Sequence, residues 1–184
     1  KKKAGRGLLI FAGVLAVLLV FTFVSGYFNI FYAWGSKQKL EDVSIDAQLL
    51  ENGDLRITET WVLNMQNRGR PYTNGYKSFS SGGYNGIEDL SVYDHDSKVE
   101  YTLLTDMGNP EVGNYPSNSC YIVDKGYEFE LGWFFAPIDK GVRTFTFSYT
   151  MTNIASVYSD TGELYVGFIG RYFAFPIENL SITL

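Results

Sequence analysis

The chain offers few side chains that could carry out catalysis. It has one histidine, His95, and one cysteine, Cys120, so a Cys–His pair for nucleophilic catalysis would require these two. His95 stands between Asp94 and Asp96 after a strand-like run, where a solvated turn is expected, and Cys120 lies in an apolar run, where burial is expected. A zinc site usually draws three or four ligands from His, Cys and carboxylates. With one histidine and one cysteine, the chain could build such a site only with carboxylates as the remaining ligands. We therefore expect a non-enzymatic protein with no catalytic residue, no metal and no cofactor.

Carboxylates are the remaining source of acid–base or calcium chemistry. Glu128 and Glu130 are two residues apart on one predicted strand, so their side chains share a face. A solvated stripe is the simpler interpretation, and acid–base catalysis or calcium binding is the alternative. Glu59 falls on an otherwise apolar strand face, where we expect it to pair with an arginine such as Arg143 or Arg171. Two further groups could hold calcium, although neither has the spacing of an EF-hand loop: Asp94, Asp96 and Asp106, and Asp139, Asp160 and Glu163.

Aromatic residues make up 17% of the chain and are its main resource for binding. Residues 66–86 are polar, rich in Gly, Ser and Asn, and dotted with aromatic side chains, a composition typical of binding loops. We predict a long surface loop there, interrupted at most by a short strand at 76–79. The candidate partner-binding residues are Tyr72, Tyr76, Phe79 and Tyr84.

The N-terminal residues predict a membrane anchor. No charged residue occurs from 7 to 36, and three lysines and Arg6 precede this run. A bilayer core needs about 20 apolar residues of helix, so residues 8–34 can span it once. Because basic flanks stay on the cytoplasmic side, residues 1–7 are predicted to be cytoplasmic and the chain beyond the helix extracytoplasmic. A cleaved signal peptide is the alternative, but no convincing small-x-small cleavage site follows this long run.

The predicted helix is also a candidate interaction surface within the bilayer. Its apolar run continues without charge to Ser36 and includes several aromatic residues that suit a membrane–water interface. The candidate residues at this helix interface are Gly13, Gly26, Tyr27, Phe31 and Trp34.

The part of the chain beyond the helix is acidic. Four of the 15 basic residues precede the apolar run, so 11 remain against 20 acidic residues, and this part carries a net charge of −9. Nucleic-acid binding requires a basic footprint, so we expect none. A single cysteine permits no disulfide within the domain, even on the oxidising side of the membrane.

Alternating polar and apolar residues predict an all-β domain over residues 43–184, joined to the helix by a linker at 35–42. Asn52-Gly53 between two such runs is a strong hairpin signal, and no amphipathic helix is found. About nine short strands favour an immunoglobulin-like antiparallel β-sandwich. The clearest pair is expected from 126–135 and 142–151. The other predicted strands are 43–50, 54–64, 87–94, 99–105, 120–124, 163–170 and 177–184.

Several segments in order resemble the N-terminal domain of domain-of-unknown-function family 2207, a family of predicted bacterial membrane proteins. They include AQLLENGDLRITETW (47–61), GWFFAP (132–137), RTFTFSYTMTN (143–153), ELYVGFIG (163–170) and PIENLSITL (176–184). The resemblance implies a β-domain that is followed by further membrane helices and a Gly-rich tail, so we expect this chain to be a fragment. An Arg-rich segment expected after the second strand is replaced here by the Tyr/Gly/Ser residues 72–84.

Two function hypotheses follow from these patterns. The first is a membrane-anchored, extracytoplasmic β-sandwich that mediates protein–protein association or assembly in the bacterial cell envelope, with the lipid bilayer and one or more envelope proteins as its partners. The alternative is a glycan-binding or glycan-processing domain, in which aromatic side chains stack on sugars and Glu128 and Glu130 are the candidate carboxylates.

Overall fold

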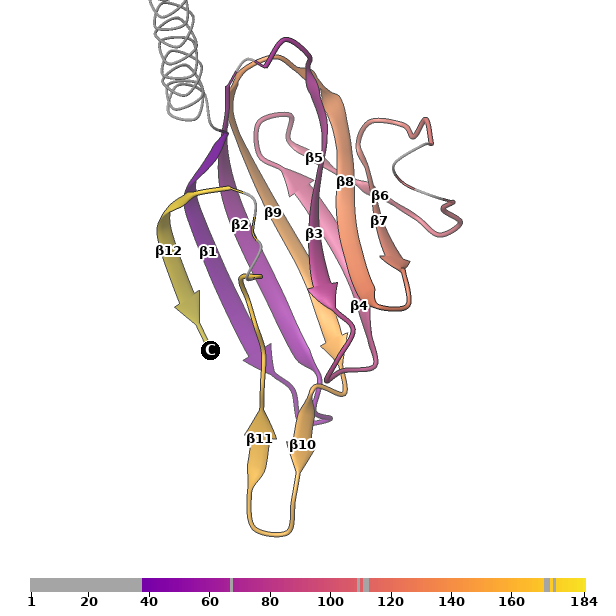
Figure 1. Cartoon of the computed structure of the whole chain (residues 1–184), viewed down its shortest axis with the longest axis vertical. Coiled ribbons are helices and arrows are strands. Elements are labelled where there is room, and N and C mark those ends of the chain that lie inside the picture. Colours follow the sequence, from indigo (N-terminus) through magenta and orange to yellow (C-terminus); the bar gives the residue numbers. More distant parts are fainter. Residues whose placement is uncertain (1–37, 67, 109, 111–112, 171–172, 174) are drawn as a thin grey trace, which may run out of the picture. The chain divides into compact units, whose positions relative to one another are not determined.

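The computed structural model of the chain describes residues 38–66, 68–108, 110, 113–170, 173 and 175–184 (Figure 1). The predicted cytoplasmic segment 1–7, the predicted membrane helix 8–34 and its candidate interface residues lie outside the described residues. Gln38–Leu184 is one compact unit. Over the described ranges, no helix is long and apolar enough to cross a membrane.

The described residues form strands and connecting loops, which confirms the all-β prediction. The strands are β1 (Lys39–Leu49), β2 (Leu55–Met65), β3 (Tyr72–Ser80), β4 (Gly86–Asp94), β5 (Val99–Glu100), β6 (Thr102–Leu104), β7 (Ser119–Asp124), β8 (Glu128–Ile138), β9 (Gly141–Thr152), β10 (Ala155–Val157), β11 (Gly162–Leu164) and β12 (Ile177–Thr183).

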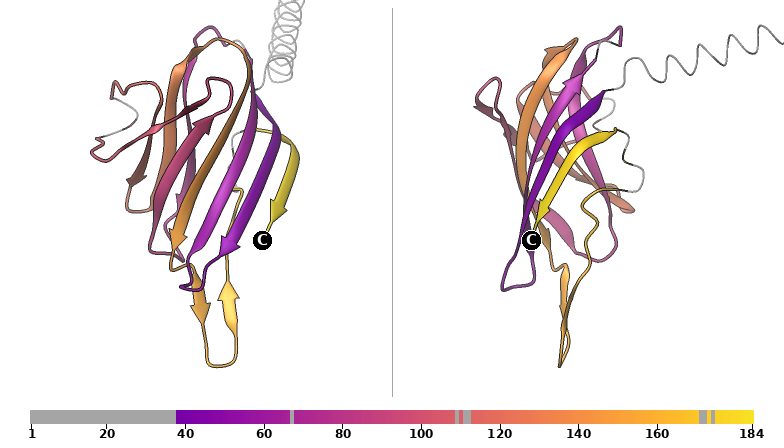
Figure 2. Two further views of the ribbon diagram at one scale, coloured as in Figure 1. Left: turned by 180° about the vertical axis from the view of Figure 1, so that it is seen from behind. Right: turned by 90° about the vertical axis from the view of Figure 1, so that its left-hand side faces the viewer.

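Two sheets and one small hairpin account for all of these strands. Sheet A has the order β12-β1-β2-β9-β4-β5, and sheet B has the order β3-β8-β7-β6. The β10–β11 hairpin projects from one end of the domain (Figures 1 and 2). Most pairs are antiparallel, as predicted, but β1–β12 and β6–β7 are parallel. The expectation of an antiparallel sandwich is therefore wrong for these two pairs.

The core lies between the two sheets and is rich in aromatic side chains. On β9, Phe145, Phe147 and Tyr149 are buried, as the alternation of that strand predicts. The Trp133 ring from sheet B lies 5.9 Å from Trp61 and 5.1 Å from Phe147 of sheet A, measured between ring centroids. These contacts across the sheets explain why the apolar face of each strand is withdrawn from water.

The β1–β2 hairpin forms where the Asn-Gly signal predicts it. Gly53 has φ +86°, a conformation that L side chains rarely adopt, and its N–H donates to the Leu50 carbonyl at 3.0 Å. The register then pairs Leu49 with Leu55 and places Ile57 and Trp61 on the buried face.

Three sequence-based assignments of strands are wrong. Strands β8 and β9 follow one another directly but lie in different sheets, so they do not pair. The short strand predicted at 76–79 is part of the nine-residue strand β3, which pairs with β8, so the prediction of a long loop over residues 66–86 is wrong. The run 163–170 is a strand only over β11.

The predicted strand 99–105 is interrupted at Tyr101, where the chain passes from sheet A to sheet B. The Tyr101 N–H donates to Val92 on β4, and the next N–H, from Thr102, donates to Asn118 before β7. The Tyr101 side chain is buried at this crossing. One predicted strand therefore becomes β5 in one sheet and β6 in the other.

Candidate functional site

The most unusual chemical feature of the domain is a charged cluster in its core. Glu59 of β2 is fully buried and accepts hydrogen bonds from three side chains. The Tyr149 hydroxyl donates to Oε1 at 2.6 Å, the Trp61 Nε1–H donates to Oε2 at 2.9 Å, and the Lys77 ammonium donates to Oε1. The expected arginine partner is therefore wrong: Arg143 pairs with Asp94, and Arg171 lies outside the described residues.

Lys77 reaches this cluster from β3, so the ion pair joins the two sheets. Its Nζ lies 4.9 Å from the Phe79 ring centroid, and only 4% of the residue is exposed. Burial lowers the pKa of Lys77 despite the opposing attraction of Glu59. Burial also raises the pKa of Tyr149, and the neighbouring Glu59 charge raises it further.

The buried cluster is closed to a substrate, because its charged atoms face one another and aromatic rings. Every polar atom of the Glu59 carboxylate already accepts a hydrogen bond. The cluster therefore links strands β2 and β9 of sheet A to strand β3 of sheet B.

The second carboxylate cluster contains Glu128 and Glu130. Lys125 donates to Glu128 Oε1 at 3.3 Å and to Glu130 Oε2 at 2.8 Å, and the Tyr121 hydroxyl donates to Glu130 Oε1 at 2.9 Å. The hydrogen bond to Glu130 is the main cause of the raised pKa of Lys125. Glu130 is buried, so the predicted solvated stripe is wrong for this residue.

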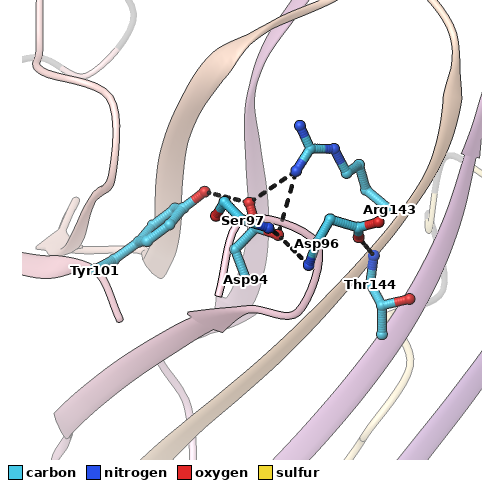
Figure 3. A network of polar contacts seen from close by, with 6 residues as sticks. All are labelled: Asp94, Asp96, Ser97, Tyr101, Arg143 and Thr144. Atoms are coloured by element: carbon cyan, nitrogen blue, oxygen red, sulfur yellow. Dashed lines mark hydrogen bonds and ion pairs between the residues drawn. The ribbon is translucent and has the colours of Figure 1, made fainter. Parts of the chain in front are cut away.

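Asp94 is the centre of a third polar network, at the end of β4 (Figure 3). Its carboxylate accepts from Arg143 at 3.1 Å, from the Tyr101 hydroxyl at 3.2 Å, and from the backbone N–H groups of Asp96 and Ser97. Burial alone would raise the pKa of Asp94, but the hydrogen bonds from Ser97 and Asp96 and the charge of Arg143 together lower it.

The hydrogen bonds of this network show why the Asp94-His95-Asp96 sequence forms a turn. Asp94 caps the turn, and Asp96 Oδ2 accepts from the Thr144 N–H on β9 at 2.9 Å. His95 is exposed, as expected, and its Nε2 lies 2.8 Å from Thr146 Oγ1. The described residues contain no group of three or more His, Cys, Asp or Glu side chains that could hold a metal, so neither of the two carboxylate groups considered for calcium is assembled there.

Cys120 is fully buried on β7, as its apolar surroundings predict. Burial raises the pKa of its thiol to about 11, and the Glu100 charge adds to this effect. A thiolate nucleophile needs the opposite shift, so this thiol is poorly suited to catalysis near neutral pH.

The four candidate partner-binding residues have different surroundings. Tyr72 and Phe79 are buried in the core, and the Tyr72 hydroxyl donates to the Gln66 carbonyl at 2.8 Å. Tyr84 is partly buried, and burial raises its pKa to about 12, with Asp124 as a second cause. Tyr76 is 58% exposed, so it alone among the four presents most of its side chain to solvent.

Two apolar surfaces were not identified from the sequence. One follows the β10–β11 hairpin and the residue after it: Val157, Tyr158 and Tyr165 are 85%, 55% and 93% exposed. The other lies on β12, where Leu180 and Ile182 are 48% and 45% exposed. The alternation of β12 was visible in the sequence, but its position at the edge of a sheet was not.

One protein family matches residues 39–184, and its description is "Predicted membrane protein (DUF2207) N-terminal domain". No curated protein matches the chain. A solved structure with some similarity comes from Parabacteroides distasonis ATCC 8503 and is described as a "putative protease". It is 10% identical with a TM-score of 0.32, and the match covers 63% of this chain but only 23% of that one. At this TM-score the similarity carries no argument about fold or activity.

Proposed function

Because the chain belongs to the DUF2207 family of predicted membrane proteins, we propose that its β-domain mediates protein–protein association outside the bacterial cytoplasmic membrane. In this proposal residues 8–34 cross the membrane once, with the N-terminus in the cytoplasm, and the domain needs no cofactor. The family description supports the membrane setting, and the sequence pattern of the N-terminal residues supports the topology.

The observation that carries this proposal is the contrast between enclosed polar groups and exposed apolar groups. The Glu59, Glu130 and Asp94 carboxylates are all engaged by neighbouring side chains. Tyr165, in contrast, is 93% exposed beside a projecting hairpin, and Leu180 is 48% exposed on β12. Exposed apolar groups of this kind are typical of surfaces that another protein covers.

We further infer that the fold is of the immunoglobulin-like sandwich class. Two sheets with one shared aromatic core support this assignment, as do the short strands and tight turns. The parallel pairs β1–β12 and β6–β7 are departures from it at the edges of the sheets.

The glycan alternative is favoured less by these contacts. A retaining glycosidase needs two carboxyl groups that flank an accessible bond, whereas Glu128 and Glu130 both contact Lys125 and Glu130 is buried. A glycan-binding version of this alternative would use the exposed Tyr76 side chain as its stacking platform. Titration with peptidoglycan fragments tests it.

Site-specific photo-crosslinking in intact cells tests the association hypothesis. A photoreactive aromatic residue is placed at Tyr165 or Leu180, and at Thr58 on the polar face of β2 as the matched exposed control. We expect one or a few defined protein adducts from the first two positions and none from the third. Equal or absent crosslinking at all three positions would refute the proposal.

A further inference from the structure

The four sheet edges of the domain differ in how they are protected against pairing with another strand. Native edges are usually short, bulged or marked by an inward-pointing charge. Strands β5 and β6 have two and three residues, and β3 carries a register shift between Tyr72 and Asn74 together with the inward charge of Lys77. Among the described strands, β12 is the edge that has none of these features.

Strand β12 is seven residues long, and its partner is β1 on one side only. It contains no Pro, Gly, Lys or Arg, and its one charge, on Glu178, is paired with Lys39 at 2.8 Å. Its outer backbone groups are therefore available for an additional ladder of hydrogen bonds.

The apolar face of β12 continues the core but is left half-exposed. In the parallel register, Leu180 aligns with Val43 and Ile182 with Ile45. Val43 and Ile45 are 0% and 2% exposed, whereas Leu180 and Ile182 are 48% and 45% exposed. Side chains that point to the same face should be covered to a similar degree once a neighbouring strand is present.

We propose that β12 pairs antiparallel with β12 of a second copy of this chain, so that the two six-stranded sheets become one continuous sheet. The inference rests on the proposed function and makes it specific: the partner is a second copy, and the surface is the free edge of β12. A two-fold axis perpendicular to the sheet would make the contact isologous and keep both core faces on the same side.

The sequence of β12 selects the register of this pair. In an antiparallel pair, directly opposite side chains lie on the same face of the sheet. The two-fold axis must therefore lie midway between the two copies of a single residue of β12, so that apolar positions face apolar positions. An axis at Leu180 would place Glu178 opposite Ile182 on the core face. An axis at Ser181 places Leu180 opposite Ile182 twice and pairs Asn179 with Thr183 on the polar face, while Glu178 falls opposite Leu184, one residue beyond the end of β12.

A cysteine at the axis tests the register directly. With the axis at Ser181, the two Cα atoms of a Ser181→Cys pair would be about 4.5–5.5 Å apart, within the span of a disulfide. The matched control is Asn179→Cys, on the same strand and face, whose two copies would be offset by four positions, or about 13 Å. The native Cys120 is fully buried and does not compete.

The experiment uses the full chain in detergent under mild oxidation, read by non-reducing electrophoresis. We expect a disulfide-linked dimer from Ser181→Cys, no dimer above the wild-type level from Asn179→Cys, and loss of the dimer in the double variant Ser181→Cys/Ile182→Lys. Equal crosslinking of the two cysteine variants, or none, overturns the pairing.

The outcome can be separated from that of the proposed function. If photo-crosslinking at Leu180 yields adducts with another protein while Ser181→Cys gives no dimer, the association function stands and self-pairing through β12 is wrong. If neither experiment yields an adduct, both are wrong.

Discussion

Lys77 of β3 and Glu59 of β2 form a buried ion pair that joins the two sheets of the domain. The pair is enclosed by the Trp61, Phe79 and Tyr149 rings, and Tyr149 and Trp61 also donate hydrogen bonds to the carboxylate. Because each charge is withdrawn from water, the stability of the domain depends on both partners being present.

Replacing Lys77 by methionine should destabilise the domain by about 3–5 kcal/mol, because Glu59 would remain charged and buried without its cation. The double variant Glu59→Leu/Lys77→Met should recover most of this loss, since neither charge would remain. Denaturant unfolding followed by the fluorescence of the buried Trp61 and Trp133 measures both effects. Lys140→Met, at an exposed lysine, is the control. A Lys77→Met variant as stable as the wild type would contradict the structural role of the pair.

Replacing Asp94 by asparagine should reduce stability at pH 7 by roughly 1.5–3 kcal/mol, because hydrogen bonds to a charged group are lost. The folded-state pKa of Asp94 is lowered, so its contribution is complete above the ordinary carboxyl pKa and is lost as the pH falls through the lowered value. The difference between wild type and Asp94→Asn should therefore shrink below about pH 4. Unfolding free energies measured from pH 7 to pH 2.5 check this, and a difference independent of pH would refute it.

Two glycines allow aromatic rings to lie against the backbone of sheet B. A Cβ at Gly132 would lie 2.5 Å from the Tyr121 ring, and one at Gly75 would lie 2.7 Å from Trp133. Alanine at either position should cost about 1–3 kcal/mol, because the ring or the strand must shift. Gly162→Ala is the matched control, since its nearest neighbour would be 3.8 Å away. Thermal unfolding of the three variants distinguishes them, and equal melting temperatures would refute the close approach.

The Cys120 thiol should be inert in the folded protein. It is fully buried, and its pKa is raised to about 11, so little thiolate forms and reagents cannot reach it. Reaction with a chromogenic disulfide reagent at pH 8 should be slow in buffer and complete after denaturation. Rapid labelling of the folded chain would show that β7 opens readily.

Local alternation was sufficient to predict the strands that form the centre of sheet A. In β2 and β9 the side chains alternate between core and solvent by backbone geometry, so the burial of Ile57, Trp61 and Phe147 followed from the sequence. The Asn-Gly turn also predicted the β1–β2 pairing, because few other residues tolerate the conformation that Gly53 adopts.

The pairing between sheets could not be predicted in the same way. The partner of Glu59 is Lys77, which comes from the other sheet and from a segment whose Gly and Ser residues suggest a loop. Gly75 weakens the strand pattern of that segment, and the reason for a glycine there is a distant residue. The Trp133 ring lies where a side chain at position 75 would be. Similarly, the short connection from β8 to β9 suggests a hairpin, whereas the chain crosses between the sheets there.

The parallel pairing of β1 with β12 has a mechanical consequence. The chain enters the domain at the start of one of these strands and leaves at the end of the other, and the two strands run side by side in the same direction (Figure 1). Tension applied to the chain on either side of the domain would therefore act along the ladder, which extends from Leu40–Ile177 to Asp46–Thr183. Its hydrogen bonds would be loaded together in shear instead of being broken one at a time, so under such tension the first and last strands of the domain would resist separation.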